Sequence, residues 1–82
     1  MLEIHKPTER VVLILKTISD HDAGCTLTDI CHFTGISKGT AFPILSTLTE
    51  LGVLYKHPST NIYTIGAECF RIGYSFLRNM NI

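Results

Sequence analysis

The sequence lacks an excess of charge of either sign. Its seven lysines and arginines balance seven aspartates and glutamates, so the net charge is zero with histidine neutral. A nucleic-acid-binding domain often has an isoelectric point above about 9, and this composition gives no such support to a polyanionic partner. The function therefore has to be argued from motifs rather than from overall charge.

Cysteines and long apolar segments are also scarce. Cys25, Cys31 and Cys69 are odd in number and form no CxxC pair, which argues against a disulfide framework and a four-ligand zinc site. The longest aliphatic run, residues 11–15, is far shorter than the roughly 20 residues that a membrane span needs. We therefore expect free thiols, no signal peptide, no membrane partner and a cytoplasmic location.

The chain is too short for a second domain. Its 82 residues, 45% of them hydrophobic, provide material for one domain with a single core. A domain of this size buries only about 60% of the surface of its unfolded chain, so a deep internal cavity is not expected. A binding module is favoured over an enzyme, and we expect no catalytic residue, no cofactor and no metal ion.

Helical periodicity is present in the first part of the chain. Within residues 8–20, Val11, Ile14, Leu15 and Ile18 follow the spacing i, i+3, i+4 and i+7, which keeps one face of a helix apolar. The polar residues and the glycine that follow break this period. A first helix is therefore predicted, with its apolar face toward the core.

Capping signals delimit two more helices. Thr26, with Asp29 three residues later, is typical of an N-cap, and Gly35 suits a tight turn because glycine adopts positive φ without steric cost. Ser37 is expected to cap a third helix, which Gly52 ends. The inward face of this third helix is predicted to hold Ala41, Leu45 and Leu48.

Two strand-like segments and a last helix follow. Residues 53–56 and 62–65 are predicted to form a β-hairpin around the turn-forming residues 57–61. Helical spacing returns from residue 67 to about residue 79. An apolar stripe on that helix consists of Phe70, Tyr74 and Leu77. Since one small core leaves little to cover this stripe, we expect a second copy of the chain to cover it.

The order helix, short helix, glycine turn, helix and hairpin is that of a winged helix-turn-helix. We predict a mainly α fold, namely a three-helix winged helix-turn-helix with a two-stranded β wing and a C-terminal linker helix. Residues 1–82 are expected to form this single domain, with the core at residues 7–66 and the linker or dimerisation helix at residues 67–80.

Five short runs add a more specific signal: LTDI at residues 27–30, GISKGTA at 35–41, LSTLTELG at 45–52, YTIG at 63–66 and RIG at 71–73. With these runs, residues 7–78 resemble the N-terminal DNA-binding domain of the IclR family of bacterial transcriptional regulators. The resemblance implies sequence-specific binding of double-stranded DNA for transcriptional regulation, as a homodimer.

The resemblance also bears on the rest of the protein. Members of the family join this domain, through the helix after the wing, to a larger domain that binds small metabolites and controls operator binding. A small-molecule effector would therefore act only through a domain absent from this chain. The chain is either a fragment of a longer regulator or a lone DNA-binding unit.

The third helix and the wing are where the resemblance places DNA, with the helix in the major groove and the wing on the backbone. Carried over by position, the DNA-binding residues are Ser37, Lys38, Gly39, Thr40, Phe42, Pro43, Ser46, Thr47, Lys56 and His57. The chain departs from the family at Phe42 and Pro43, where relatives carry His or Tyr followed by Arg. It departs again at Ile62 and Thr64, where the wing of relatives carries arginine.

The neutral charge leaves a rival interpretation open. Residues 30–67 contain two lysines, Lys38 and Lys56, and one acid, Glu50, so this segment carries only +1. Lys38 is expected to contact phosphate. Phe42 is equally suited to pack on a neighbouring helix and to touch a thymine methyl group. The rival is a winged-helix protein-interaction module, in which the surface around Phe42 docks in a protein groove.

Pro43 raises a problem for the third helix. If Ser37 is the N-cap, Pro43 lies six residues into the helix, lacks the N–H that should bond the carbonyl of Gly39, and costs about 3 kcal/mol. A helix that begins near Gly39 or Thr40 would place the proline in the first turn, where this penalty largely disappears. We therefore predict a delayed start or a kink around residues 38–42, and weak operator affinity.

Two histidines and two cysteines allow one further alternative. His21, Cys25, Cys31 and His32 have the spacing H-x3-C-x5-C-H, but the ligand pairs of zinc sites lie closer together in sequence. The favoured interpretation is that Cys31 and Cys69 are small buried hydrophobes.

Overall fold

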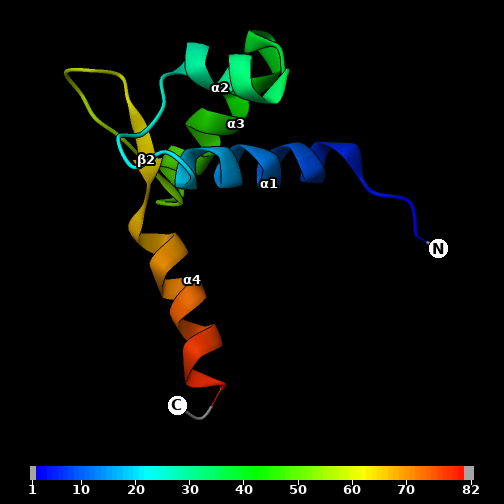
Figure 1. Ribbon diagram of the computed structural model, residues 1–82, viewed down its shortest axis with the longest axis vertical. Helices are drawn as coiled ribbons and strands as arrows, with labels where there is room; N and C mark the ends of the chain where they lie inside the picture. The colour runs from blue at the N-terminus through cyan, green and yellow to red at the C-terminus, as the bar shows by residue number, and fades with distance from the viewer. Residues whose placement is uncertain (1, 81–82) are drawn as a thin grey trace.

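In a computed structural model that describes residues 2–80, the chain forms four helices and a two-stranded antiparallel sheet (Figure 1). The elements, in chain order, are α1 (Lys6–Ser19), α2 (Leu27–Thr34), α3 (Lys38–Glu50), β1 (Leu54–Lys56), β2 (Tyr63–Ile65) and α4 (Ala67–Arg78). Each predicted element is present, with bounds within two residues of those expected. The winged helix-turn-helix arrangement is confirmed. Residues 2–80 contain no helix that is long and apolar enough to cross a membrane.

The core lies where α1, α2 and α3 meet the sheet. From α1, Ile14 and Ile18 are buried, and Val11 and Leu15 pack against them. The predicted inward face of α3, which consists of Ala41, Leu45 and Leu48, is buried as expected. Ile30 of α2 completes the contact between the helices. Full burial of one such aliphatic side chain stabilises the fold by about 1.5–3 kcal/mol, so this cluster determines how the three helices are placed.

Caps fix the helix-turn-helix itself. The Thr26 hydroxyl accepts a hydrogen bond from the Asp29 backbone N–H at 3.1 Å, and the Asp29 carboxylate accepts one from the Thr26 N–H at 3.0 Å. This capping box starts α2 at the predicted position. Gly35 ends α2 with φ of 74° and donates its N–H to the Cys31 carbonyl at 3.0 Å. Ser37 then caps α3, as predicted.

Of the two alternatives predicted for α3, the delayed start is wrong, and a kink around residues 38–42 stays a prediction. The helix begins at Lys38 and continues through Pro43 to Glu50. The Ser37 carbonyl accepts hydrogen bonds from the N–H groups of Thr40 and Ala41 at 3.1 and 2.8 Å, so the first turn is closed immediately after the cap. Pro43 has no N–H for the Gly39 carbonyl, but Gly39 is exposed, and water can reach that group. The buried face of α3 requires a continuous helix, and its burial outweighs the defect.

The wing, which is the hairpin of β1 and β2, is attached to the three helices α1, α2 and α3 through the connection between α1 and α2. In the hairpin, Leu54 pairs with Ile65 and Lys56 with Tyr63. Cys25 forms an additional antiparallel bridge to Tyr63, with N–H to carbonyl distances of 3.0 and 2.7 Å in the two directions. This bridge, which sequence periodicity did not predict, fixes the hairpin against the helices.

The helix α4 projects from the body as a separate arm (Figure 1). One hydrogen bond that joins α4 to the rest of the chain runs from the Cys69 thiol to the Val53 carbonyl, next to β1, at 3.3 Å. None of its residues is buried. The expectation that Cys31 and Cys69 are buried is wrong, because both are only half-buried, whereas Cys25 is buried.

Candidate nucleic-acid interface

The exposed side of α3 carries most of the predicted DNA-binding residues. All eight of those that precede the wing are exposed: Ser37, Lys38, Gly39, Thr40, Phe42, Pro43, Ser46 and Thr47. Successive residues of a helix are rotated by about 100°, so Gly39, Pro43, Ser46 and Glu50 face directly away from the buried side. This outermost row contains one carboxylate and no cation. The surface of α3 that a groove of DNA would meet first is therefore nearly neutral.

The remaining residues of α3 lie on two flanks. On one flank lies Thr47, which together with Pro43 of the outermost row and Val11 of α1 lines a shallow apolar depression of about 270 Å³. On the other flank, Phe42 is 47% exposed and turns toward the wing. Phe42 therefore lies outside the core, and its contact with a thymine methyl group stays a prediction.

Lys38 stands at the first position of α3 and is exposed. Among residues 2–80, the ion pairs are Lys6 with Glu9 and Arg71 with Glu68, and neither Lys38 nor Lys56 takes part in one. Both lysines of the predicted interface are thus free to meet an anion.

The two predicted wing residues point to opposite sides of the strand. The Lys56 ammonium lies over the Tyr63 ring, 5.5 Å from its centroid. His57 instead contacts Thr64 through Nε2 at 3.2 Å, and its ring packs edge-on against Tyr55 at 4.7 Å. Adjacent residues of a strand alternate between its faces, so only Lys56 shares a surface with Phe42.

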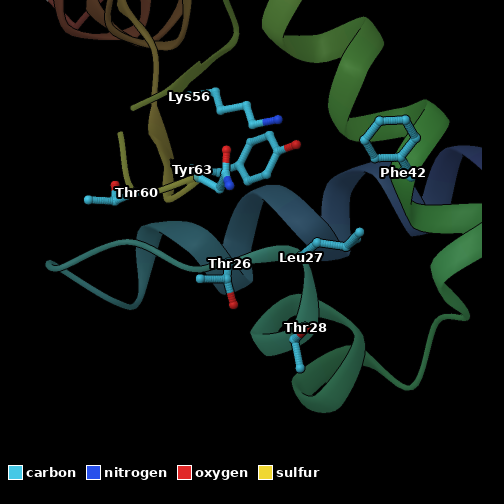
Figure 2. A pocket seen from close by; sticks show the side chains of 8 residues that line it. Thr26, Leu27, Thr28, Phe42, Lys56, Thr60 and Tyr63 are labelled. Carbon is cyan, nitrogen blue, oxygen red and sulfur yellow. The ribbon is translucent and has the colours of Figure 1, made fainter. Parts of the chain in front are cut away.

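A groove of about 430 Å³ separates α3 from the wing (Figure 2). Residues from four elements and the connecting loops line it: Thr26, Leu27, Thr28, Phe42, Lys56, Thr60, Asn61 and Tyr63. Sequence reasoning found Phe42 and Lys56 but missed the others. Thr26 was recognised only as a helix cap, and residues 57–61 only as turn formers. Asn61 has φ of 58°, a left-handed conformation that asparagine tolerates in turns.

A carboxylate, that of Asp29, is hydrogen-bonded to Thr26, one of the residues that line this groove. Backbone and side-chain hydrogen bonds with Thr26 hold the pKa of Asp29 below its ordinary value, so Asp29 is negatively charged near neutral pH. Because this carboxylate already interacts with the positive end of α2, that helix end is a poor site for a second anion. Burial, with a smaller contribution from Asp29, raises the pKa of the Cys25 thiol and makes it a weak nucleophile.

The residues of the zinc alternative have other partners. No group of three or more His, Cys, Asp or Glu side chains in residues 2–80 is arranged to hold a metal ion. The His21 ring stacks on Phe33 at 4.6 Å between centroids, and its Nδ1 lies 2.7 Å from the Thr17 carbonyl oxygen. His21 therefore closes the end of α1 against α2.

Two curated proteins match most of this chain. The glycerol operon regulatory protein of Streptomyces coelicolor is 33% identical over 69 residues, which are 84% of this chain and 27% of that protein. The transcriptional repressor IclR of Escherichia coli is 26% identical over 73 residues, which are 89% of this chain and 27% of that protein. The chain thus spans 27% of the length of these curated relatives.

Solved structures share the fold. An IclR family transcriptional regulator from Brucella abortus superposes with a TM-score of 0.83 at 25% identity, over 93% of this chain and 29% of that one. Pseudomonas aeruginosa HmgR superposes with a TM-score of 0.84 at 24% identity, over 95% of this chain and 33% of that one. This likeness shows the fold alone. The family model for the IclR helix-turn-helix domain matches residues 7–58. This chain belongs to the IclR helix-turn-helix domain family.

Proposed function

We propose that this chain binds double-stranded DNA as the DNA-binding domain of a transcriptional regulator, with α3 in the major groove and the wing on the backbone. The observation that carries the proposal is the exposure of α3 next to a wing, with Lys38 and Lys56 both free of ion pairs among residues 2–80. The relatives named as an operon regulatory protein and a transcriptional repressor support the same assignment.

The proposed contacts divide by chemistry. Lys38 and Lys56 meet phosphates, which provides affinity without sequence information. Pro43 and Ser46 face outward from α3 and meet base edges, where the Ser46 hydroxyl donates or accepts hydrogen bonds and the Pro43 ring makes apolar contact. Two cations in one copy are few, since proteins that contact about 6–10 phosphates obtain most of their affinity from such charges. Binding by a single copy is therefore weak.

A second copy of the chain compensates for this weakness. Five large apolar residues of α4 are exposed: Phe70, Ile72, Tyr74, Phe76 and Leu77. With about 100° per residue, they cover roughly half of the helix circumference, which is wider than the stripe of a typical surface helix. Pairing of the arms in a homodimer would cover part of this surface and double the number of cations on the DNA.

The cellular setting follows from the same proposal. Binding of a chromosomal operator would place the protein in the cytoplasm. Any small-molecule effector would act through a domain outside this chain, as the resemblance implies. The chain itself then serves DNA binding and dimer formation, and the proposal gives it no catalytic step.

The test is direct titration of a fluorescent mixed-sequence duplex with the protein at several salt concentrations. Binding at low salt that weakens steeply as salt rises supports the proposal, because neutralised phosphates release counterions. Absence of binding at low salt would contradict it and would favour a winged-helix protein-interaction module, with the surface around Phe42 as its docking site.

A further inference from the structure

The groove between α3 and the wing contains a polar group that the fold leaves unused. Tyr63 is only 3% exposed, and its backbone and ring are held in the sheet and the core. Its hydroxyl group, however, takes part in none of the side-chain hydrogen bonds of residues 2–80. Because no buried polar side-chain atom in this part of the chain lacks a partner, this hydroxyl is accessible from the groove that Tyr63 lines. In Figure 2 this hydroxyl and the Lys56 ammonium point in the same direction, toward the side of the groove where Phe42 lies.

A tyrosine can bury its ring and present its hydroxyl group to a partner outside the core, and Tyr63 has this arrangement. Here the surroundings indicate which partner fits. The Lys56 ammonium, 5.5 Å from the centroid of the Tyr63 ring, adds a positive charge beside the hydroxyl donor. Thr60 and Asn61 at the wing contribute further polar atoms, whereas Leu27 and Phe42 make the opposite side apolar. An anionic oxygen flanked by an apolar group matches this groove, and a sugar–phosphate strand has that composition.

We propose that the Tyr63 hydroxyl and the Lys56 ammonium together hold one phosphate of a DNA backbone strand, whose sugar packs against Phe42. The inference rests on the proposed function and adds the Tyr63 hydroxyl to the phosphate contact proposed there for Lys56. The groove lies between the helix and the wing, so the strand that it holds separates the major groove entered by α3 from the adjacent minor groove.

Two features agree with this assignment. The hydroxyl of Tyr63 is positioned before DNA arrives, because the ring is fixed in the core, so its hydrogen bond to phosphate costs little ordering entropy. The start of α2, which borders the groove, is already neutralised by the Asp29 carboxylate. The groove therefore depends on its own two donors for the phosphate.

The Tyr63→Phe variant isolates the hydroxyl group. It retains the ring that packs in the core and supports Lys56, and the hydroxyl has no partner in the fold, so the melting temperature is expected to stay unchanged. Tyr55→Phe is the matched control, because Tyr55 is 52% exposed and packs against His57 on the other face of the hairpin. Loss of a hydrogen bond to a charged group is expected to weaken duplex binding about tenfold in Tyr63→Phe. Tyr55→Phe should bind like the parent.

A double-mutant cycle with Lys56→Gln separates a shared site from a structural role. If both groups hold one phosphate, Tyr63→Phe costs less in the Lys56→Gln background than in the parent. Lys56→Gln should also reduce the salt slope by about one, whereas Tyr63→Phe should leave the slope unchanged because it removes no charge. Both variants should weaken all duplex sequences equally.

A second arm of the experiment distinguishes a DNA phosphate from a free anion. Inorganic phosphate is titrated against the parent and against Tyr63→Phe, with NMR of the wing amides as the readout. Saturable phosphate binding that Tyr63→Phe abolishes, with unchanged duplex binding, would overturn the DNA-strand assignment in favour of a free anion. Unchanged duplex binding and no phosphate effect would overturn the site while leaving DNA binding by α3 intact. Failure of the parent to bind any duplex would instead contradict the proposed function.

Discussion

The body formed by α1, α2, α3 and the wing differs sharply from the arm α4. In the body Ile14, Ile30 and Leu45 are buried where the helices meet, and the exposed side of α3 is nearly neutral. In α4 the arrangement is reversed, because Phe76 is 66% exposed and no residue of the helix is buried. The body therefore contains the hydrophobic core, whereas the arm leaves a large apolar surface exposed. This difference supports the proposal that DNA contact and self-association belong to separate parts of an 82-residue chain.

The largest expected effect is a difference in the free energy of unfolding between variants of the body and variants of α4. Leu45→Ala removes a fully buried side chain from α3 and should lower the free energy of unfolding by about 2–5 kcal/mol. Phe76→Ala on α4 removes a larger side chain but should leave the unfolding of dilute monomer nearly unchanged. Chemical denaturation monitored by circular dichroism measures both.

At high protein concentration the arm should show its role. Sedimentation velocity is expected to detect a dimer for the parent and a loss of that dimer for Phe76→Ala. Equal destabilisation of dilute Leu45→Ala and Phe76→Ala would show that α4 belongs to the core. A parent that stays monomeric at high concentration would remove the reason given for the exposed surface.

Substitution of Pro43 tests the role of α3 in stability and in DNA binding. Pro43→Arg restores an N–H that can donate to the Gly39 carbonyl, so α3 should be stabilised by up to about 3 kcal/mol. The guanidinium group also adds a donor fork suited to guanine or phosphate, and duplex affinity should rise.

Pro43→Ala is the control that separates these two effects. It should increase the melting temperature while leaving duplex affinity near that of the parent. If Pro43→Arg is more stable than the parent yet binds duplex no better at low salt, α3 is not the element that reads DNA.

The cap of α2 gives a smaller effect with a defined pH dependence. Thr26→Ala should lower the free energy of unfolding by about 1 kcal/mol through loss of the capping box. Because hydrogen bonds with Thr26 lower the pKa of Asp29 in the folded state, Asp29 stabilises the protein above its ordinary pKa of 3.8. This contribution is lost as the pH falls below that value, through the lowered pKa of the folded state.

Asp29→Asn tests the sign of this pH dependence. The amide oxygen can still accept from the Thr26 N–H, but it does not titrate, so stability should decrease less steeply below pH 3.8 than in the parent. Thermal unfolding across the acidic range provides the measurement. Identical pH profiles for the parent and Asp29→Asn would show that the capping box does not hold the carboxylate in its charged form.

The smallest effect concerns single surface charges on the two regions. Lys38→Ala should reduce the salt slope of duplex binding by about one per copy and weaken all sequences nearly equally. Arg78→Ala on α4 is the matched control, because Arg78 lies 5.8 Å from the Tyr74 ring on the arm and is expected to leave the slope unchanged. A changed sequence preference in Lys38→Ala would move Lys38 from phosphate contact to base recognition.

Much of the fold could be predicted because local signals determine it. Helical spacing identified the buried faces of α1 and α3, and the caps at Thr26 and Ser37 marked where α2 and α3 begin. Pro43 misled the prediction of the start of α3, since local propensity alone omits the burial that keeps the helix continuous. The bridge between Cys25 and Tyr63 joins segments far apart in sequence, and no periodicity records such a pairing.

The candidate site could be predicted only in part for the same reason. Residues of α3 followed from their place on the helix, but the groove depends on how the wing sits against α2 and α3. Lys56 and His57 are neighbours in sequence and lie on opposite faces of the strand, a distinction that required the register of the hairpin. The role proposed for the Tyr63 hydroxyl depends on a ring that is buried and a hydroxyl group that faces the groove, and neither follows from the sequence.

The most direct test of the central claim is an NMR map of the isotopically labelled chain titrated with duplex DNA. The account predicts shifts in the backbone amides of residues 37–47 and of the wing around Lys56 and Tyr63. Amides of the exposed α4 surface around Phe76 should move only when the oligomeric state changes. Shifts that cluster on α4 or around Phe33 at the end of α2, with α3 and the wing unaffected, would contradict the assignment of DNA binding to the body.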